Sequence, residues 1–403
     1  MEIINQFKNL VKKQELIDLI QKIVQIPSTP ETDGYETKVA EYIYQYFLNE
    51  GIEAQLVEVK DGRPNVIAKI KGSGNGPALM LTGHMDTVPA YDMDIEPFKG
   101  EIKDGKLYGR GAVDMKGPLA AMILSLVAIK RSDITLKGDL IFAGVIEEEY
   151  KSFGTEYLVK NGPGADAAIV GEPSQLKIAA GHRGLEWLEI TVKGKAAHGG
   201  TADKGINAIS KTAKLINKIE SDLIPKFAER THDLIGPPTL NFGVIKGGTQ
   251  PSSVADKCIL QIDRRWTPLE TLSQVFVELD DIIKEIQKED KDFKATVERI
   301  PSNMATMDHA PMEIDLDHPL VNGLEKTTKE ILGNKAEIVA FPGWTDASLL
   351  SNFAKIDTVV FGPGDISCAH SEVEYIDLKD AYRGFLIYSL IARNYCNNLC
   401  EEE

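Results

Sequence analysis

Five side chains with nitrogen or oxygen donors follow apolar segments that are expected to be strands. They are two histidines and three acids: His84, Asp114, Glu149, Glu172 and His370. Two imidazoles and three carboxylates, with no thiolate, can hold two divalent metal ions that share one carboxylate. This donor set predicts hydrolytic chemistry on a carbonyl group rather than redox chemistry or a structural zinc site.

The first donor follows the apolar run 77–83, which predicts a buried strand. His84 comes next, and Asp86 follows two residues later. Residues two apart in an extended chain point to the same side, so Asp86 can accept the second ring N–H of His84 and fix its tautomer. Taken alone, the His-x-Asp spacing fits a polar pair in an ordinary loop equally well.

The second donor lies in a glycine-rich turn. Asp114 is preceded by glycines at positions 109 and 111, followed by one at 117, and then by the apolar run 119–129, which predicts a buried helix. An acid at such a turn is often only a helix N-cap. The functional interpretation is that Asp114 bridges two metal ions.

The third cluster is the acidic run 147–149, which directly follows the predicted strand 139–146. Three adjacent acids at the end of an apolar strand repel one another, and a cation would hold them together. If one of them binds a metal, a neighbour can act as general base, with a pKa closer to neutrality than the ~4.3 of free glutamate. A solvated acidic loop is the alternative.

The remaining two donors repeat this pattern. Glu172 follows the predicted strand 165–170, and His370 follows an apolar run at 358–361 and a Gly-Pro-Gly turn. A single histidine after such a turn is more often a surface residue. Donors that recur after several strands, however, are typical of open α/β sheets, whose sites lie at the carboxyl ends of the strands.

Together these motifs resemble the dinuclear-zinc metallohydrolases that include acetylornithine deacetylase, succinyl-diaminopimelate desuccinylase, aminoacylase and glutamate carboxypeptidase. The matching segments follow the family's order along nearly the whole chain: GHMDTVPA, GRGAVDMKGPLAA, EEEYKSFG, GEPS, AHGG, GWTDASLLS and FGPGDISCAHSEVEYI. The resemblance implies two divalent metal ions as cofactors, with zinc favoured and cobalt or manganese as alternatives.

The resemblance also implies a role for each matching residue. The implied metal ligands are His84 and Glu172 for one ion, Glu149 and His370 for the other, and Asp114 between them. Glu148 would be the general base, because the segment 152–154 sets the register of the acidic run. Asp86 would support catalysis beside His84, and Glu147 would bind no metal. Lys151 stands where the family often has glycine.

Two further implied site residues lie in the segment 184–300. In the family, the histidine that matches His198 reaches the active site of a partner subunit and stabilises an oxyanion, which implies a homodimer. Arg265 matches a family arginine and could bind a substrate carboxylate, although a surface ion pair is an equal alternative. Ser252 stands where the family often has asparagine, so the contact made by that amide is in doubt.

The length of 403 residues predicts two domains. Alternating helices and apolar strands from residue 12 to 181 predict an α/β domain with a mostly parallel sheet and helices on both faces. The patterns within 184–300 predict the order βαββαβ, a ferredoxin-like module. We therefore expect a metal-binding catalytic domain from residues 1–183 and 301–403, with 184–300 inserted as a lid and dimerisation domain.

Composition excludes several classes of partner. A formal net charge of −16 argues against nucleic acid and anionic membranes as partners. Residues 1–26 are expected to form an amphipathic helix rather than a secretory signal, and the run 119–129 is shorter than the ~20 residues that span a bilayer. The four cysteines show no paired CxxC spacing. These features favour a cytoplasmic protein.

The predicted function is hydrolysis of the amide bond of an N-acyl amino acid, as in acetylornithine deacetylase or succinyl-diaminopimelate desuccinylase. Metal-bound water would attack the carbonyl, with Glu148 taking and returning the proton. A dipeptidase or glutamate-type carboxypeptidase is the alternative within the family. A binding protein without activity is a third hypothesis, against which the intact ligand set and Glu148 argue.

Overall fold

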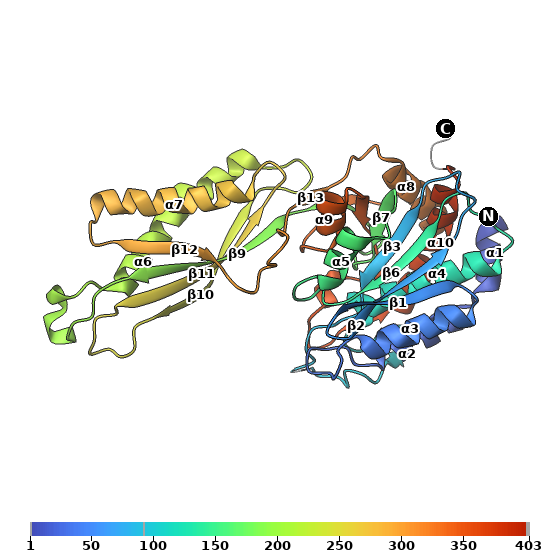
Figure 1. The fold of residues 1–403 in the computed structure, drawn as a ribbon, viewed down its shortest axis with the longest axis horizontal. Coiled ribbons are helices and arrows are strands. Elements are labelled where there is room, and N and C mark those ends of the chain that lie inside the picture. The colour runs from blue at the N-terminus through green and yellow to red at the C-terminus, as the bar shows by residue number, and fades with distance from the viewer. Residues whose placement is uncertain (1, 92, 400–403) are drawn as a thin grey trace. The chain divides into compact units, whose positions relative to one another are not determined.

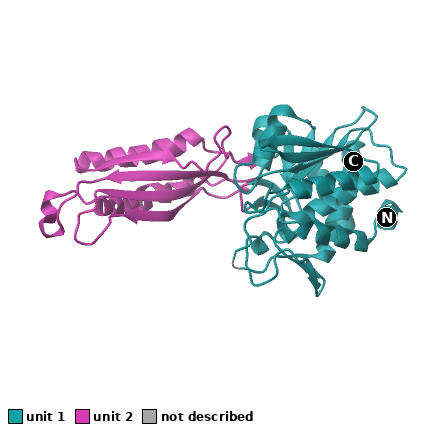
Figure 2. Cartoon of the chain, turned by 60° about the horizontal axis from the view of Figure 1, so that its bottom comes forward, with its two compact units in different colours: residues 1–181, 313–341, 345–403 teal, residues 182–312, 342–344 magenta. Residues whose placement is uncertain are grey.

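The computed structural model describes residues 2–91 and 93–399, and the chain divides into two compact units (Figure 2). Unit 1 consists of residues 1–181, 313–341 and 345–403, and unit 2 of residues 182–312 and 342–344. Unit 2 extends beyond the expected end at residue 300 because the following segment bonds back to it. The N–H of Leu185 donates to the carbonyl of His309 (2.9 Å), and the Asn303 amide donates to the Glu186 carboxylate (2.8 Å).

Unit 1 is built around a sheet of nine strands in the order β1-β2-β6-β3-β7-β15-β8-β13, with β14 paired to β8. The strands are β1 (Glu53–Lys60), β2 (Arg63–Ile70), β3 (Leu79–His84), β6 (Leu140–Val145), β7 (Ala167–Val170), β8 (Ile178–His182), β13 (Met312–Glu313), β14 (Ile338–Phe341) and β15 (Asp357–Val360). A small second sheet contains β4 (Glu101–Lys103), β5 (Lys106–Tyr108) and β16 (Tyr375–Asp377).

The α/β class is confirmed, but the large sheet is mixed rather than mostly parallel. Its central strands β6, β3, β7 and β15 run parallel, whereas β1 with β2, β2 with β6, and β15 with β8 are antiparallel. The β1–β2 pair is a hairpin, because Lys60 is opposite Arg63 across the two-residue turn Asp61-Gly62. Both turn residues have positive φ (50° and 75°), as tight hairpin turns require.

Helices pack against the sheet of unit 1 (Figure 1). They are α1 (Glu2–Leu10), α2 (Lys13–Val24), α3 (Thr37–Asn49), α4 (Gly117–Arg131), α5 (Phe153–Asn161), α8 (Pro319–Leu332), α9 (Ala347–Leu349) and α10 (Leu378–Cys396), with short helical turns at Ala112–Lys116, Leu350–Ala354 and Ile366–Cys368. The expected helix 1–26 is wrong in its described part, because α1 and α2 are separated at Val11 and Lys12. The carbonyls of Leu10 and Val11, which a continuous helix would use, instead accept from Arg131 (2.9 Å) and Tyr382 (3.2 Å).

Helix α4 forms the centre of the core of unit 1. Every residue from Gly117 to Ile129 is buried, and the helix packs on α10 and on β3. With the preceding turn, the segment Ala112–Arg131 is long and apolar enough to span a membrane, but its apolar stretch of 18 residues is entirely buried within the protein. Such burial is typical of a core helix of a soluble protein. The helix therefore anchors the turn that carries Asp114.

Unit 2 contains a four-stranded antiparallel sheet in the order β10-β11-β9-β12. Its elements are β9 (Gly184–Lys193), α6 (Ala208–Lys218), β10 (Thr239–Gly247), β11 (Lys257–Trp266), α7 (Leu272–Glu289) and β12 (Lys294–Arg299), with short helical turns at Gly199–Lys204, Ile219–Leu223 and Ile224–Arg230. This is the βαββαβ order of ferredoxin-like modules. Apolar residues of α6, α7 and the sheet form a core of their own. The role of the unit as a lid and dimerisation domain remains a prediction.

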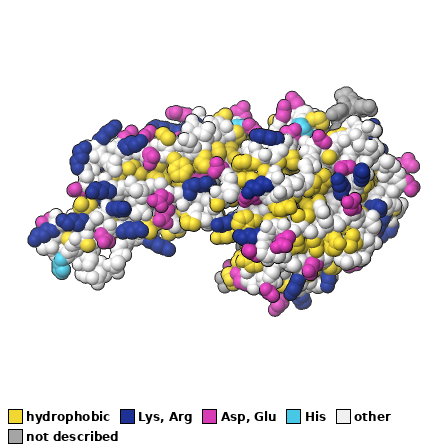
Figure 3. Space-filling view, in the orientation of Figure 1, with side chains coloured by type: hydrophobic (Ala, Val, Ile, Leu, Met, Phe, Trp, Pro, Cys, Tyr) yellow, Lys and Arg dark blue, Asp and Glu magenta, His cyan; other side chains and the backbone are white. Residues whose placement is uncertain are grey.

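The surface carries charges of both signs. On the face shown in Figure 3, acidic and basic side chains are interspersed over both units. Cys258 and Cys396 are buried and Cys368 is half-buried, while Cys400 lies outside the described residues.

Candidate metal centre

The central strands of unit 1 deliver most of the predicted donors to one edge of the sheet. His84 is the last residue of β3, the acidic run 147–149 follows β6, Glu172 follows β7, and His370 follows β15. Because these four strands are parallel neighbours, the segments that follow them meet at their carboxyl ends. Asp114 reaches the same place from the turn before α4.

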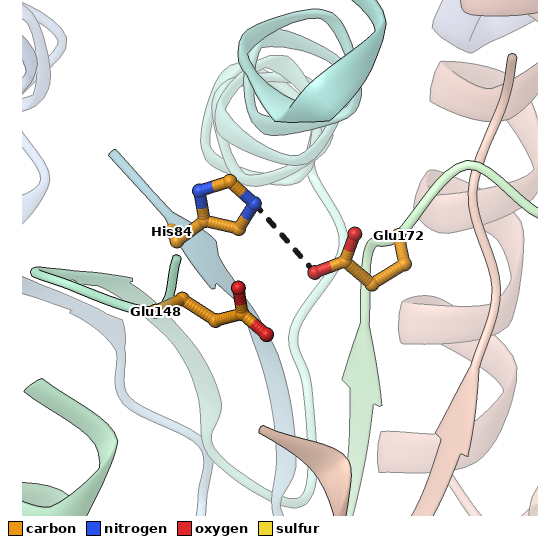
Figure 4. A group of neighbouring side chains, drawn as sticks. All are labelled: His84, Glu148 and Glu172. Carbon is orange, nitrogen blue, oxygen red and sulfur yellow. Dashed lines mark ion pairs between the residues drawn. The ribbon is translucent and has the colours of Figure 1, made fainter. Parts of the chain in front are cut away.

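Asp114 lies between the two imidazoles. Its Oδ1 is 3.0 Å from Nε2 of His84, and its Oδ2 is 3.2 Å from Nε2 of His370. Each imidazole has a second carboxylate beside it. Glu172 Oε1 lies 3.7 Å from His84 Nε2, and Glu149 Oε1 lies 3.0 Å from His370 Nε2. The five side chains thus form two donor sets that share one carboxylate, and Figure 4 shows the His84–Glu172 side of the group.

The side chains present fit two divalent cations. Donor atoms of His84, Asp114 and Glu149 lie within 4.8 Å of one another, as do those of His84, Glu148 and Glu172. Nitrogen and carboxylate donors at such separations suit zinc, cobalt and manganese. The second group also brings Glu148, the predicted general base, to within the same distance of two predicted ligands (Figure 4).

The electrostatics of the acidic side chains explain why a cation is needed. Burial, followed by the charge of Asp114, raises the pKa of both Glu172 and Glu149. Burial, followed by the charges of Glu172 and Asp346, raises the pKa of Glu148 well above its ordinary value. Each of these carboxyl groups is therefore easier to protonate in the protein alone, and bound cations would favour the charged forms.

The pKa values of the two imidazoles are also raised, which for a histidine favours the charged form. Hydrogen bonds to Asp114 and Glu149 raise the pKa of His370 to about 10. For His84, burial lowers the pKa, but the hydrogen bonds to Asp114 and Asp86 outweigh burial and raise it well above the usual value. Both rings therefore hold protons that a metal ion would displace, so metal binding should release protons.

The carboxylate of Asp86 was expected to accept the second ring N–H of His84, but the backbone of Asp86 lies closer to that nitrogen. His84 Nδ1 lies 2.9 Å from the backbone carbonyl oxygen of Asp86 and 3.5 Å from its carboxylate. The carboxylate accepts hydrogen bonds from the backbone N–H groups of Glu148 (3.1 Å) and Glu149 (3.0 Å). Asp86 thus orients the imidazole mainly through its backbone, while its side chain holds the acidic turn.

The acidic turn is closed by two residues in the left-handed conformation, Glu147 (φ 61°) and Ser152 (φ 51°). The carbonyl of Glu147 accepts from the N–H groups of Lys151 (3.1 Å) and Ser152 (2.6 Å). Lys151 itself is not left-handed, so the glycine that the family often has here is not required by the backbone. A cavity of about 440 Å³ adjoins this turn, and its lining includes Glu149 and Tyr150.

Sequence reasoning missed the buried polar pair of Glu374 and Arg110 beside the centre. Glu374 Oε1 accepts from the backbone N–H groups of Val113 (3.1 Å) and Asp114 (3.2 Å), and Arg110 Nη1 lies 2.6 Å from its Oε2. Glu374 lies in one of the family segments, but nothing local links it to a turn about 260 residues away. Asp346 accepts from Thr155 (2.6 Å), and burial raises its pKa to about 6.

The two other predicted site residues belong to unit 2. His198 is exposed and caps the short helical turn Gly199–Lys204, where its Nδ1 accepts from the N–H of Gly200 (3.0 Å). Arg265, in β11, is half-buried and donates through Nε and Nη2 to both carboxylate oxygens of Asp263 (2.8 and 3.0 Å). The carbonyl of Ser252 accepts from the N–H of Gly199 (2.7 Å) and so supports the His198 loop. The roles of His198 and Arg265 remain predictions.

Residues 80–394 match the family described as Peptidase family M20/M25/M40, which covers more than half of the sequence. The chain belongs to this family. The match includes every predicted metal ligand and Glu148. Proteins similar to this chain are named for deacylation as well as for peptide hydrolysis.

Two relatives match over almost their full length. "Probable succinyl-diaminopimelate desuccinylase" of Staphylococcus epidermidis is 31% identical over 96% of this chain and 99% of its own. "Acetylornithine deacetylase" of Proteus mirabilis is 31% identical over 96% of this chain and 98% of its own. Among solved structures, a Bacillus subtilis protein described as a dinuclear metal binding peptidase from the M20 family has a TM-score of 0.70 at 17% identity, covering 94% of this chain and 97% of that one. The protein is thus an M20-family hydrolase by both sequence and fold.

Proposed function

We propose that this M20-family hydrolase removes the acyl group from an N-acyl amino acid, in the manner of an acetylornithine deacetylase or a succinyl-diaminopimelate desuccinylase. The observation that carries the proposal is the position of Asp114 between two imidazoles, each with a second carboxylate beside it. The relatives at 31% identity are named for removal of a succinyl or an acetyl group, which favours deacylation.

Two divalent metal ions would be held by His84 and Glu172 on one side and by Glu149 and His370 on the other, with Asp114 shared. Zinc is the first candidate, and cobalt and manganese are the alternatives. When bound, such ions polarise a carbonyl group and lower the pKa of water. The negative charges of the three carboxylates, two of them buried and that of Glu149 half-buried, would offset the charges of the ions.

Glu148 would move the proton. Its backbone N–H is fixed by Asp86, and its carboxylate lies in the same group as His84 and Glu172. Burial and the charges of Glu172 and Asp346 raise its pKa well above that of an ordinary glutamate, which makes it a stronger base for proton transfer. Glu148 would therefore take a proton from the attacking water and return it to the departing amine.

Unit 2 would complete the site as a lid and as the contact of a homodimer. His198 would donate a hydrogen bond to the developing oxyanion in the partner's site. Arg265 would bind the substrate carboxylate, and Asp263 would orient its guanidinium through the two bonds described above. We further propose that the protein acts in the cytoplasm on small molecules.

A dipeptidase or a glutamate-type carboxypeptidase is the second candidate, which the solved structure described as a peptidase favours. Protein loaded with zinc, cobalt or manganese should be assayed against N-acetyl amino acids, N-succinyl amino acids and dipeptides. We expect turnover of the N-acyl compounds and little turnover of dipeptides. Exclusive hydrolysis of dipeptides would replace the deacylase proposal with the peptidase one, and no turnover with any metal would refute both.

A further inference from the structure

The backbone of the acidic turn is held by side chains from other parts of unit 1. Four consecutive N–H groups, those of residues 146–149, each donate to a side-chain oxygen. The acceptors are Asn65 for Ile146 (3.1 Å), Glu36 for Glu147 (3.1 Å), and the two carboxylate oxygens of Asp86 for Glu148 (3.1 Å) and Glu149 (3.0 Å). The position of the turn thus depends on these three acceptors.

One arginine, Arg63, contacts both Glu36 and the side chain of Glu147 in the acidic turn. Arg63, the first residue of β2, lies 3.4 and 3.3 Å from the two carboxylate oxygens of Glu36 through Nη1, and its Nη2 pairs with the carboxylate of Glu147. Arg63 and Glu147 are each 7% exposed and Glu36 is fully buried. The ring of Tyr35 lies 4.4 Å from the guanidinium carbon. A single buried cation therefore pairs with two buried carboxylates.

Glu147 is the residue of the acidic turn that both Arg63 and Glu36 contact. It is left-handed (φ 61°), a conformation that residues with a side chain adopt mainly where their surroundings enforce it. Its side chain is held by Arg63 and its N–H by Glu36. The next two residues in the chain are Glu148 and Glu149. A change in the backbone of Glu147 would therefore move both of their carboxylates.

We propose that Arg63 and Glu36 are positioning residues, which set the direction of the Glu148 and Glu149 side chains through Glu147. The proposal rests on the proposed function, because it assigns these two glutamates to proton transfer and metal binding. A displacement of about 1 Å at a reacting group can cost on the order of 100-fold in rate. Arg63 and Glu36 themselves touch neither substrate nor metal in this role.

The main test compares Arg63→Met, Arg63→Lys and Glu36→Gln with the wild type, all fully loaded with cobalt. For Arg63→Met we expect kcat to fall by about 100-fold with KM changed less than about threefold, because the proton carrier moves while substrate binding persists. Arg63→Lys should recover part of the loss, since it keeps the charge but not the fork of donors. Glu36→Gln should lose less, because its amide oxygen can still accept the N–H of Glu147.

A matched control is available in the same unit. Arg131 also joins two glutamates, Glu15 (2.7 Å) and Glu50 (2.6 Å), but it is the last residue of α4, about 22 Å along the helix from the Asp114 turn. We expect Arg131→Met to leave kcat unchanged even if it lowers the melting temperature. Equal kcat losses in Arg131→Met and Arg63→Met would show a general effect of stability and overturn the proposal.

A spectroscopic measurement separates this proposal from the proposed function. The visible absorption of bound Co²⁺ depends on the geometry of its ligands and needs no substrate. We expect Arg63→Met to change this spectrum at unchanged cobalt stoichiometry, because Glu149 moves. An unchanged spectrum with wild-type kcat overturns the positioning role. If the wild type turns over no substrate, the proposed function is refuted. The Co²⁺ spectrum then still tests whether Arg63 and Glu36 are positioning residues. If Arg63→Met does not fold, the kcat values and Co²⁺ spectra of Glu36→Gln and Arg63→Lys test the positioning role in its place.

Discussion

At the scale of single residues, each acid of the centre is distinguished by what its oxygens face. Asp114 faces an imidazole on either side, whereas Glu148 has Glu172 and Asp346 as charged neighbours and no hydrogen bond to an imidazole among those described. A carboxylate between two rings is suited to bridge cations. A carboxylate among other acids keeps a raised pKa and is suited to carry a proton.

The first prediction concerns Glu148. We expect Glu148→Gln to lower kcat by about 10²- to 10⁴-fold, the usual contribution of general acid–base catalysis. Metal content, measured by atomic emission, should stay at the wild-type level, since the assigned ligands are intact. The control is Glu337→Gln, the same change in an exposed pair with Lys177, which should leave kcat unchanged. Loss of metal from Glu148→Gln would instead make Glu148 a ligand.

The second prediction concerns His309 in unit 2. Its ring is buried edge-on against Trp344 (centroids 4.6 Å apart), and its Nδ1 has no hydrogen-bond partner among the described residues. Burial lowers the pKa of His309 to about 4, whereas the unfolded chain has a histidine pKa of ~6.5. Between these values the unfolded chain binds a proton that the folded protein does not. Stability should therefore fall as the pH falls from about 6.5 to 4.

His309→Phe tests this pH dependence because it keeps an aromatic ring against Trp344 and cannot bind a proton. We expect the variant to lose less stability than the wild type between pH 7 and pH 5, by up to ~1.4 kcal/mol per pH unit for one proton. Urea unfolding followed by tryptophan fluorescence at the two pH values gives the comparison. Identical losses in both proteins would contradict the role of His309.

At the scale of elements, the centre depends on close approach of strands and turns. A Cβ atom added to Gly362, just after β15, would lie 2.3 Å from the carbonyl oxygen of Gly171 and 2.5 Å from that of Glu172. These are backbone atoms and cannot rotate away. The glycine therefore allows the segment after β15 to lie against the segment that carries Glu172.

The third prediction follows from this contact. We expect Gly362→Ala to lower the free energy of unfolding by about 1–3 kcal/mol, as overpacking usually does, and to weaken metal binding because Glu172 must shift. Chemical denaturation and metal titration measure the two effects. Gly164→Ala is the matched control, since Gly164 is not left-handed and a Cβ there meets no atom within 4 Å. Equal effects of the two substitutions would refute the packing argument.

The donors could be found from sequence because each is signalled locally, four of them by a preceding apolar run and Asp114 by the glycines around it. The antiparallel edge of the sheet was also signalled by Asp61-Gly62, a common hairpin turn. The break between α1 and α2 had no such signal. It arises where Arg131 and Tyr382, far away in the chain, take two carbonyls of the first helical segment.

The supports of the centre could not be predicted for the same reason. Arg63 is 27 residues from Glu36 and 84 from Glu147, and each of the three resembles an ordinary charged surface residue in sequence. Their burial and pairing arise only when β2 and the turn after β6 are brought together in the folded sheet. Long-range ion pairs leave no periodic pattern, so the ligands of a site are easier to predict than the residues that hold them.

At the scale of the whole molecule, the proposed dimer makes a distinct prediction. If His198 acts in the partner's site, two inactive variants should complement each other. We expect mixed Glu148→Gln and His198→Ala proteins, unfolded and refolded together, to recover up to about a quarter of wild-type activity, because half of the dimers are hybrids with one complete site. Activity assays and light scattering measure recovery and mass. A dimer without recovery would place His198 in its own subunit's site.

The order of strands in the large sheet has a consequence for synthesis in the cell. β15 (Asp357–Val360) separates β7 from β8, although about 175 residues lie between β8 and β15 in the chain. Until β15 has been synthesised, β7 keeps an unpaired edge, and His370 follows only after β15. During this time the edge of β7 stays exposed in the nascent chain, and exposed strand edges bind chaperones or aggregate. The complete set of predicted ligands can therefore bind metal only after His370 has been synthesised.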